Sequence, residues 1–494
     1  MKNLKLLKWI LILAALGLFA ILAARAYLAH RAAPLGPWHT HVPNELTAAE
    51  LARSDWTGYL EVESAIFTEL EMAVTRQLDP ADRVPANRYF DGSPLYPGRF
   101  AQDWNRSFVL DPDGPPVGAV VLLHGLTDSP YSLRNIARRY REHGYVAVAI
   151  RLPGHGTVPG GLTVVDWEDW TAATQLAVRE ARRRAGPGTP LHLVGYSQGG
   201  ALAMKYALDA IDDPDLPQAE RIVLISPMIG ITAFARFAGL LGLPAIFPAF
   251  ANAAWIGVLP EFNPFKYNSF PVNAARQSSL LSRLLQRRLA RAAQDGRLDA
   301  LPPILTFQSI VDFTVSTRAI VDSLYARLPA NGSELVLFDL NRSVKFGPLL
   351  HFGGDLDPAR LLPAAPRAYR TTLVTNAEAD RREVVARVIP AGETTERIDR
   401  LGLQYPSTVF SLSHVALPFP SNDPLYGLEP DEAEDFGIRL GALSLRGERG
   451  ALIVGADMLI RMSSNPFFPY LLDRIEEGID SSASGRSGID RDRL

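Results

Sequence analysis

Short apolar runs alternate with longer amphipathic stretches along the middle of this chain. Each run has the length of one buried strand, and the stretch after it repeats its apolar residues at helical spacing. Such an alternation predicts a mostly parallel sheet with helices on both faces. The elements predicted on this basis are strands at 119–123, 145–150, 191–194, 221–226 and 304–308, with helices at 130–142, 164–184 and 201–207.

The pattern becomes less regular after residue 304, although apolar runs continue. Residues 481–494 are small, polar and charged, a composition typical of a disordered tail. We therefore assign residues 114–480 to one α/β domain that ends before this tail. Further strands are predicted at 107–110, 334–338, 371–375, 384–388, 407–412 and 440–445, and a closing helix at 467–477.

Residues 1–30 have the pattern of a targeting segment. Three lysines precede the apolar run 9–24, which approaches the roughly 20 residues that a membrane-spanning helix needs. We favour an uncleaved signal anchor, with transmembrane helix and single-pass topology, because the apolar part of a cleaved signal peptide is usually shorter. The alternative is a secreted or periplasmic protein after cleavage. Both interpretations place the globular part on the extracytoplasmic side of the membrane.

A second N-terminal region, residues 31–113, separates this segment from the α/β domain. Its start, 32–43, has the composition of a linker, and 44–78 predicts two helices with a break near Asp55. Prolines then recur through 79–113, which predicts mostly loop. We expect the two helices to form a stalk or a pad on the main domain.

Composition limits the classes of function that this chain can serve. Hydrophobic residues make up 47% and charged residues 21%, which is typical of a globular protein with a substantial core. The formal net charge of −3 offers no electrostatic footprint for nucleic acid. The chain has no cysteine, which excludes disulfides, a thiol nucleophile and cysteine-based metal sites.

The clearest candidate for chemistry is Ser197, in the stretch Gly195-Tyr-Ser-Gln-Gly199. A predicted strand precedes this stretch and a predicted helix follows it, so the serine lies at the apex of a tight strand-to-helix turn. Glycine on both sides of a nucleophilic serine suits such a turn, because the strained backbone and close packing leave no room for a side chain. The turn also leaves the Gln198 N–H free at a helix start, where it can bind an anion.

A serine hydroxyl needs a base to take its proton and a third group to orient that base. His414 follows the predicted strand 407–412, and the carboxyl ends of parallel strands are where open α/β sheets place their sites. His351 is the alternative base, ranked second because no clear strand delivers it. Asp312 follows strand 304–308 and can accept the imidazole N–H. The order serine, aspartate, histidine is that of the α/β-hydrolases.

An oxyanion site needs a second N–H donor besides that of Gln198. Gly125 follows the predicted strand 119–123 and permits a sharp turn, which can present the Leu126 N–H to the same point. We expect His124 to hold this loop by hydrogen bonding.

Four motifs together resemble one branch of the α/β-hydrolases, that of monoacylglycerol lipases, lysophospholipases and serine aminopeptidase-type enzymes. These motifs are Leu123-His-Gly-Leu-Thr127, Arg151-Leu-Pro-Gly-His-Gly-Thr157, Gly195-Tyr-Ser-Gln-Gly199 and Asp312-Phe-Thr-Val315. The resemblance implies that Ser197 is the nucleophile, Asp312 the acid, and Leu126 with Gln198 the oxyanion donors. It also implies that His155 shapes a loop beside the site.

The chain departs from this family in the distance between acid and base. The branch usually places its histidine a few tens of residues after the acid, whereas His414 lies much farther on. Either residues 334–405 are an extra insertion before the last strand, or the base is His351.

Residues 228–303 interrupt the strand–helix alternation and predict a lid. The first half is strongly apolar, with prolines that argue against a second membrane span, and 274–295 predicts an amphipathic helix. A lid with an apolar inner face suits an acyl chain or another apolar group. Its candidate substrate-binding residues are Phe234, Phe237, Phe247 and Trp255.

These observations together predict a membrane-anchored serine ester hydrolase that acts on a small-molecule or lipid ester, with no cofactor and no metal. His39 and His41 are the only close histidine pair, and we interpret them as a solvated part of the linker. The rival functions are a peptidase, an acyltransferase and a catalytically inactive, anchored binding module. A peptidase would need acidic lid residues to bind a substrate amine, and residues 228–260 contain none.

Overall fold

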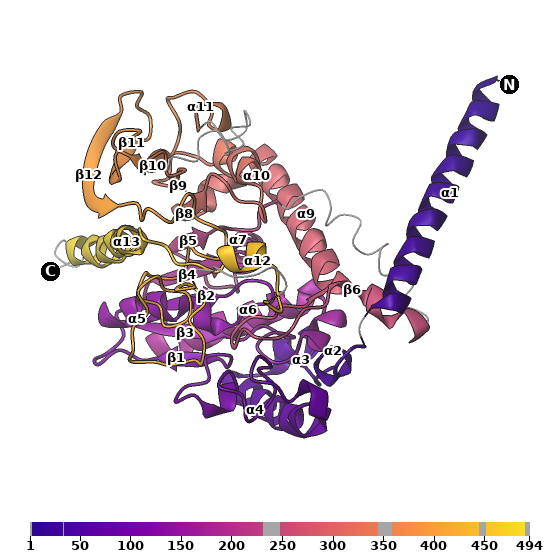
Figure 1. The fold of residues 1–494 in the computed structure, drawn as a ribbon. Helices are drawn as coiled ribbons and strands as arrows, with labels where there is room; N and C mark the ends of the chain where they lie inside the picture. Colours follow the sequence, from indigo (N-terminus) through magenta and orange to yellow (C-terminus); the bar gives the residue numbers. More distant parts are fainter. Residues whose placement is uncertain (1, 33, 231–247, 344–357, 444–450, 490–494) are drawn as a thin grey trace.

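The computed structural model describes residues 2–32, 34–230, 248–343, 358–443 and 451–489. A ten-stranded sheet runs through the main body in the order β1-β3-β2-β4-β5-β8-β9-β10-β11-β12 (Figure 1). The strands are β1 (Phe108–Leu110), β2 (Gly118–Leu123), β3 (Tyr145–Ile150), β4 (Leu191–Tyr196), β5 (Arg221–Ile225), β8 (Ile304–Ser309), β9 (Glu334–Phe338), β10 (Arg370–Asn376), β11 (Glu383–Ile389) and β12 (Arg397–Gln404).

The seven strands from β3 to β10 in this order are parallel, and β1, β11 and β12 are antiparallel to their neighbours. The helices are α1 (Lys2–Arg31), α2 (Pro37–Thr40), α3 (Ala48–Arg53), α4 (Trp56–Ala73), α5 (Arg134–Glu142), α6 (Trp167–Ala185), α7 (Gln198–Asp212), α9 (Val272–Gln294), α10 (Thr317–Ser323), α11 (Pro358–Leu361), α12 (Ala456–Ile460) and α13 (Phe468–Ile489). The predicted parallel sheet with flanking helices is confirmed.

Alternate residues of each central strand enter different cores, as the period of two requires. On β2, Val121 packs in one core with α6, α7, α9 and α10. Its neighbour Val120 packs in the other with α5 and α13. Because both faces of the sheet are covered, strands β2, β3, β4 and β8 are buried along their whole length, which explains why β2 and β3 are continuous apolar runs in the sequence.

The N-terminal region packs on the main domain instead of forming a stalk. Leu51 on α3 and Tyr59 on α4 belong to the same core as α6 and α7. The prediction of a linker at 32–43 was wrong in part, because α2 forms there and buries Trp38 and His39. Trp38 stacks on Tyr89 with ring centroids 5.6 Å apart, and this apolar contact is what orders the segment.

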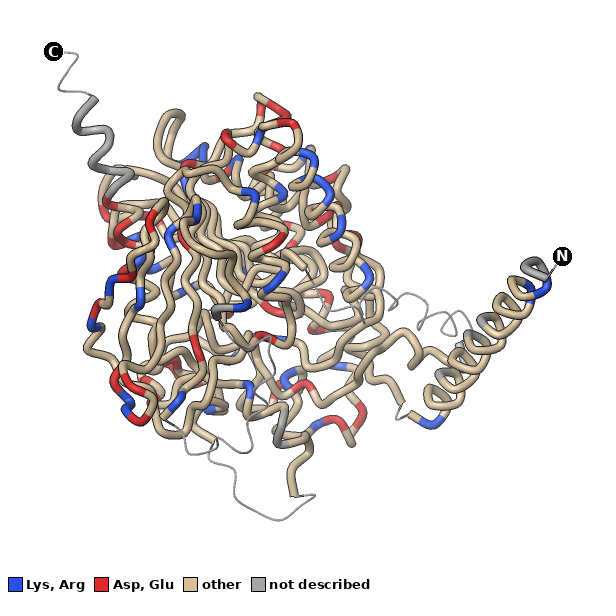
Figure 2. The backbone as a smooth tube through the Cα atoms, turned by 90° about the horizontal axis from the view of Figure 1, so that it is seen from above, with Lys and Arg blue, Asp and Glu red and all other residues tan. Residues whose placement is uncertain are grey.

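Helix α1 extends away from the body and touches it near its C-terminal end, where it contacts the short helix Pro248–Ala254 (Figure 1). Basic residues lie toward the ends of α1, while most of its length carries no charge (Figure 2). Elsewhere the two charge signs are interspersed over the body, as expected for a near-neutral chain (Figure 2).

Three predictions for the C-terminal part were wrong. Residues 407–412 form no strand, because Asn341 binds their backbone: its N–H donates to the Phe410 carbonyl (2.8 Å) and its side chain to the Val409 carbonyl (2.8 Å). Residues 440–443 form a turn, because the Leu440 N–H donates to the Leu425 carbonyl (2.7 Å), and 444–445 lie outside the described residues.

The described residues of the range 334–405 extend the sheet and do not form an insertion before a last strand. They form β9 to β12, which add to the edge at β8. The sequence concealed β12, because this edge strand is mostly exposed and its charged residues break the apolar pattern. Helix α13 is anchored by buried Leu471, Ile475 and Ile479 and extends to Ile489. Residues 490–494 lie outside the described residues, so the disordered tail at 481–494 stays a prediction.

Candidate active site

Ser197 lies at the turn between β4 and α7, with φ 53° and ψ −114°. A non-glycine residue in this region of backbone space stores about 1–3 kcal/mol of strain, and such strain concentrates at functional sites. Close packing maintains the turn: a Cβ on Gly199 would lie 1.9 Å from the Leu123 carbonyl oxygen. The glycine that follows the serine is therefore required by the approach of β2 to the start of α7.

His414 lies between Ser197 and Asp312 and contacts both. Its Nε2 is 2.9 Å from the Ser197 Oγ, and its Nδ1 is 2.8 Å from Asp312 Oδ2. An ionised carboxylate can only accept, so Nδ1 carries the proton and Nε2 is left to accept from the serine hydroxyl. The structure thus brings together the three residues that the sequence proposed as nucleophile, base and acid.

The Asp312 carboxylate is held in one orientation by its hydrogen bonds. Oδ1 accepts from the backbone N–H of Thr314 (2.8 Å) and of Val315 (3.0 Å), and Oδ2 faces His414 and Gln308 Nε2 (3.2 Å). Burial raises the pKa of Asp312, but the charge of His414 and these hydrogen bonds outweigh burial, so the pKa lies below its usual value. The carboxyl is therefore ionised at neutral pH and can orient the imidazole.

His414 is delivered by an irregular loop that other contacts hold in place. The Tyr196 hydroxyl donates to the His414 carbonyl (3.3 Å), and its ring lies 5.5 Å from the imidazole. Ser413 Oγ donates to the Arg461 carbonyl (2.6 Å), which ties the loop to the segment after α12. Although the sequence predicted a strand here, tertiary contacts position the histidine.

The two predicted oxyanion donors lie next to Ser197. A Cβ on Gly125 would be 3.3 Å from the Ser197 Cβ, so the loop carrying Leu126 passes directly over the serine. Gln198 is the first residue of α7, where N–H groups have no partner within the helix. Among the described residues, neither the Leu126 N–H nor the Gln198 N–H has a hydrogen-bond acceptor. Both are thus available to an anion.

His124 and His155 hold the neighbouring loops. His124 Nε2 accepts from the Leu152 N–H (3.1 Å), and its Nδ1 donates to the Gly125 carbonyl (2.9 Å). Burial lowers the pKa of His124 to about 3, so the ring is neutral. His155 packs edge-on against His124, and burial lowers its pKa as well. As predicted, His124 acts on the loop and makes no contact with Ser197 Oγ.

Sequence reasoning missed the buried charge cluster beneath these loops. Arg151 is fully buried and forms ion pairs with two carboxylates from the N-terminal region, those of Glu45 at 2.7 Å and Glu63 at 3.1 Å. Glu63 also accepts from Ser107, whose hydroxyl accepts from the Arg151 N–H (2.8 Å). The arginine was visible as part of a motif, but its partners lie about a hundred positions earlier, so no local signal links them.

A cavity of about 370 Å³ opens beside Ser197, Leu126 and His414. Its lining combines apolar side chains with two cations, Lys266 and Arg461. Five lining residues come from the predicted lid insertion, namely Met228, Lys266, Tyr267, Asn268 and Phe270. The Tyr267 N–H donates to the Thr127 carbonyl (2.7 Å), which joins that insertion to the loop of Leu126.

Of the four predicted substrate-binding residues, the structure describes one. Phe234, Phe237 and Phe247 lie outside the described residues, as does the alternative base His351. Trp255 was wrongly assigned to the cavity: it is buried on strand β6 (Trp255–Gly257), and its ring packs 4.9 Å from that of His39. The sequence could not reveal this contact. Trp255 belongs to an apolar stretch that predicts a lid, and its partner His39 lies far upstream in the chain.

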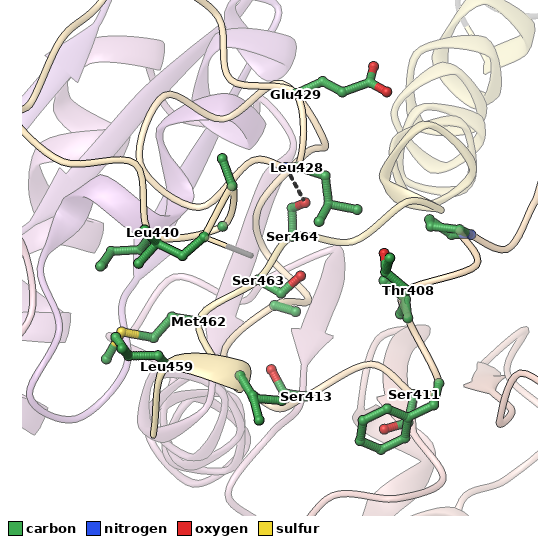
Figure 3. Close-up of a pocket in the computed structure, with 18 residues that line it drawn as sticks. Thr408, Ser411, Ser413, Leu428, Glu429, Leu440, Leu459, Met462, Ser463 and Ser464 are labelled. Atoms are coloured by element: carbon green, nitrogen blue, oxygen red, sulfur yellow. Dashed lines mark hydrogen bonds between the residues drawn. The ribbon is translucent and has the colours of Figure 1, made fainter. Parts of the chain in front are cut away.

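A second cavity, of about 400 Å³, is lined by residues between Pro406 and Ser464 (Figure 3). Met462 lines both cavities. Within the lining Ser464 Oγ accepts from the Leu428 N–H (3.3 Å), and the Glu429 carboxylate points away from the other labelled side chains (Figure 3). Among its described lining residues Glu429 is the only titratable one, so the chemistry is concentrated in the first cavity.

In the part of the chain that the structure describes, no three His, Asp or Glu side chains form a group that could hold a metal ion. The interpretation of His39 as solvated was wrong: its Nε2 lies 3.0 Å from Ser269 Oγ, and burial lowers its pKa to about 4. Within the described residues, the helical segment Lys5–Arg31 is long and apolar enough to cross a membrane, a test that signal sequences also pass.

Comparison with known proteins connects this geometry to a family. Residues 114–338 match the family described as serine aminopeptidase, S33. Over 127 residues the chain is 32% identical to the thermostable monoacylglycerol lipase of Bacillus sp. (strain H-257), a match that covers 26% of this chain and 46% of that protein. The chain thus spans about half the length of the curated relative it matches.

Solved structures with a similar fold include a metagenome-derived lipolytic enzyme from a study of LipS and LipT (22% identical, 48% of this chain and 88% of that chain, TM-score 0.38). Another is the Paleococcus ferrophilus monoacylglycerol lipase (18% identical, 47% and 87%, TM-score 0.35). The sheet order and the family match together identify an α/β-hydrolase fold, and the resemblance inferred from the four motifs is confirmed.

Proposed function

We propose that this protein is a membrane-anchored serine hydrolase that cleaves carboxylic esters. The observation that carries the proposal is the continuous contact from Asp312 through His414 to Ser197, beneath two N–H groups that have no acceptor among the described residues. A hydroxyl, an oriented base and preorganised donors at one point are what acyl transfer to a serine requires.

In the proposed mechanism Ser197 Oγ attacks the ester carbonyl carbon while His414 Nε2 takes the hydroxyl proton. The carbonyl oxygen becomes an oxyanion that accepts from the N–H groups of Leu126 and Gln198. Loss of one such donor typically costs about 3–4 kcal/mol of transition-state stabilisation. His414 then gives its proton to the leaving alcohol oxygen, which departs as the acyl-enzyme forms. Water then attacks the acyl carbon while His414 Nε2 takes its proton, and His414 returns that proton to Ser197 Oγ as the carboxylic acid departs.

We further propose that residues 228–303 act as a lid over the cavity and that α1 anchors the protein in a membrane. Support for the lid comes from Lys266, Tyr267, Asn268 and Phe270, which belong to this insertion and line the cavity. Support for the anchor comes from the uncharged length of α1 and its separation from the core (Figures 1 and 2). We expect the full-length protein to stay in membranes after alkaline carbonate washing. Deletion of residues 1–31 should release it.

The hydrolase proposal is tested by labelling the full-length protein with a fluorophosphonate. The wild type should react covalently and hydrolyse 4-nitrophenyl butyrate, and Ser197→Ala should do neither. Ser226→Ala is the matched control, because Ser226 is also a buried serine with positive φ after a neighbouring strand, yet it does not line the cavity. Equal labelling of the Ser197→Ala variant would refute the assignment and leave an inactive binding module as the better explanation.

Of the rival enzymatic functions, a peptidase that binds a substrate ammonium is disfavoured by the two cations of the cavity. Its described lining contains no carboxylate to pair with an ammonium. Hydrolysis of an aminoacyl amide faster than the matching ester would reverse this judgement. Product analysis in the presence of a second alcohol distinguishes hydrolysis from acyl transfer.

A further inference from the structure

Two positive side chains lie in the cavity beside Ser197, and neither forms an ion pair within the described residues. Lys266 makes no hydrogen bond or ion pair with any described residue. Arg461 donates from Nη2 to Thr314 Oγ1 (2.9 Å) and forms no ion pair within the described residues. Cations without a counterion in a partly desolvated cavity are costly, and an incoming anion relieves that cost.

The charges around the cavity leave an excess of positive potential. Burial lowers the pKa of Lys266, the charge of Asp128 raises it and that of Arg461 lowers it further, so the two cations lie within electrostatic reach of each other. Asp128 is buried behind the lining, and burial raises its pKa. The ionised carboxylate of Asp312 already pairs with His414, and neither it nor Asp128 lines the cavity, whereas the two cations do.

The position of Arg461 indicates which part of a substrate would meet these cations. Its carbonyl accepts from Ser413, the residue before His414, and its guanidinium reaches Thr314, whose N–H donates to Asp312. Arg461 therefore lies on the histidine side of the site. In ester cleavage the histidine protonates the departing alcohol, so groups on this side flank the alcohol portion of the substrate.

We propose that Lys266 and Arg461 form an anion subsite, and that the preferred substrate is an ester whose alcohol portion carries a phosphate group. This inference rests on the proposed hydrolase function, but binding of an anion to the subsite can be measured without turnover. Arginine and lysine together suit a phosphate, because guanidinium and ammonium donate to its oxygens while carrying the opposite charge.

A binding experiment tests the subsite directly. Full-length Ser197→Ala protein in a non-ionic detergent is titrated calorimetrically with butyl phosphate, 1-butanol and inorganic phosphate. Butyl phosphate should bind at least about 10-fold more tightly than either of the others, because charge-assisted hydrogen bonds exceed neutral ones in strength. Lys266→Met and Arg461→Met should each weaken its binding by about 10-fold to 100-fold.

Arg283→Met is the matched control, because it removes the same charge from an exposed position on α9 that does not line the cavity. An unchanged affinity in Lys266→Met and Arg461→Met, or an equal loss in Arg283→Met, would overturn the subsite. Inorganic phosphate bound as tightly as butyl phosphate would assign the cations to a free ion and overturn the substrate proposal.

A kinetic comparison separates failure of this inference from failure of the proposed function. The ratio of kcat/KM for butanoyl glycerol phosphate to that for glyceryl monobutyrate should exceed about 10 and should fall about 10-fold in Lys266→Met. High salt should lower the ratio, because it screens partly exposed charges. Hydrolysis of both esters at equal rates would remove the anion subsite and leave the hydrolase function standing.

Discussion

Replacing Asp312 by asparagine should inactivate the protein without unfolding it, because the structure dictates which way the new amide would point. Oδ1 of Asp312 accepts from the N–H groups of Thr314 and Val315, and these backbone donors cannot rotate. The asparagine oxygen must occupy this position to keep both hydrogen bonds, and the NH₂ group then faces His414 Nδ1. Gln308 Nε2, which also faces this side, donates to the Ser309 carbonyl (3.2 Å) and to Thr317 Oγ1 (3.0 Å) as well, so it keeps partners when the carboxylate is lost.

An NH₂ group can only donate to Nδ1, so His414 would carry its proton on Nε2. That nitrogen lies 2.9 Å from Ser197 Oγ and would then be unable to accept the hydroxyl proton. The same tautomer reversal in a serine protease, a worked case in this class of enzyme, lowers kcat by about 10⁴. We expect a loss of similar size, which corresponds to about 5.5 kcal/mol in the barrier.

The assay is hydrolysis of 4-nitrophenyl butyrate at pH 7.5, in parallel with fluorophosphonate labelling and thermal unfolding. The Asn variant should lose activity and labelling together, with a small change in Tm, because it retains the hydrogen bonds to Oδ1. Asp312→Ala leaves the Thr314 and Val315 N–H groups unpaired and should lower Tm more. An Asn variant that keeps a tenth of the wild-type activity would refute the assignment of Asp312 as the orienting acid.

Three further predictions concern the scaffold around the site. Gly199→Ala should destabilise the protein by about 3 kcal/mol in urea unfolding, because its Cβ would lie 1.9 Å from the Leu123 carbonyl oxygen, whereas Gly257→Ala, with open space around it, should change little. Arg151→Met should cost about 3–5 kcal/mol by leaving Glu45 and Glu63 without a cation, against little change for Arg76→Met, whose pair with Glu71 is exposed; equal losses would contradict the buried cluster. Burial lowers the pKa of His39 from 6.5 to about 4, so the unfolded state binds an extra proton in that range and stability falls as the pH decreases, by up to about 1.4 kcal/mol per pH unit. His39→Gln should show a shallower decrease of the unfolding free energy between pH 6.5 and 4, and parallel curves for the two proteins would disprove the buried neutral histidine.

The elements around Ser197 were predictable, because the signals that specify them are local. A buried strand, a glycine-flanked serine and an amphipathic helix follow one another within a few turns of chain, and the structure forms β4, the turn and α7 at these positions. The same reasoning failed for residues 407–412, where an apolar, β-branched run predicted a strand. Asn341 takes the backbone hydrogen bonds that a neighbouring strand would have made.

Other residues of the site could not be found locally. Trp255 has the apolar character of a lid residue, but its ring packs on His39 instead of lining the cavity. Arg461 and Lys266 are ordinary surface types in the sequence, and their shared place at the cavity depends on folding of the whole C-terminal region. Neither residue belongs to a sequence motif or to a periodic hydrophobic pattern.

By itself, the sequence determined the strand–helix order, the strained turn at Ser197 and the turn at Gly125, since these follow from residue periodicity and backbone sterics within short segments. Only the tertiary structure decided which histidine and which carboxylate meet the serine. His414 is 217 positions from Ser197 and 102 from Asp312, and no propensity acts over such distances. The sheet brings the ends of β4 and β8, and with them Ser197 and Asp312, to one edge. Hydrogen bonds that exist only in the folded protein hold the loop that carries His414 beside them.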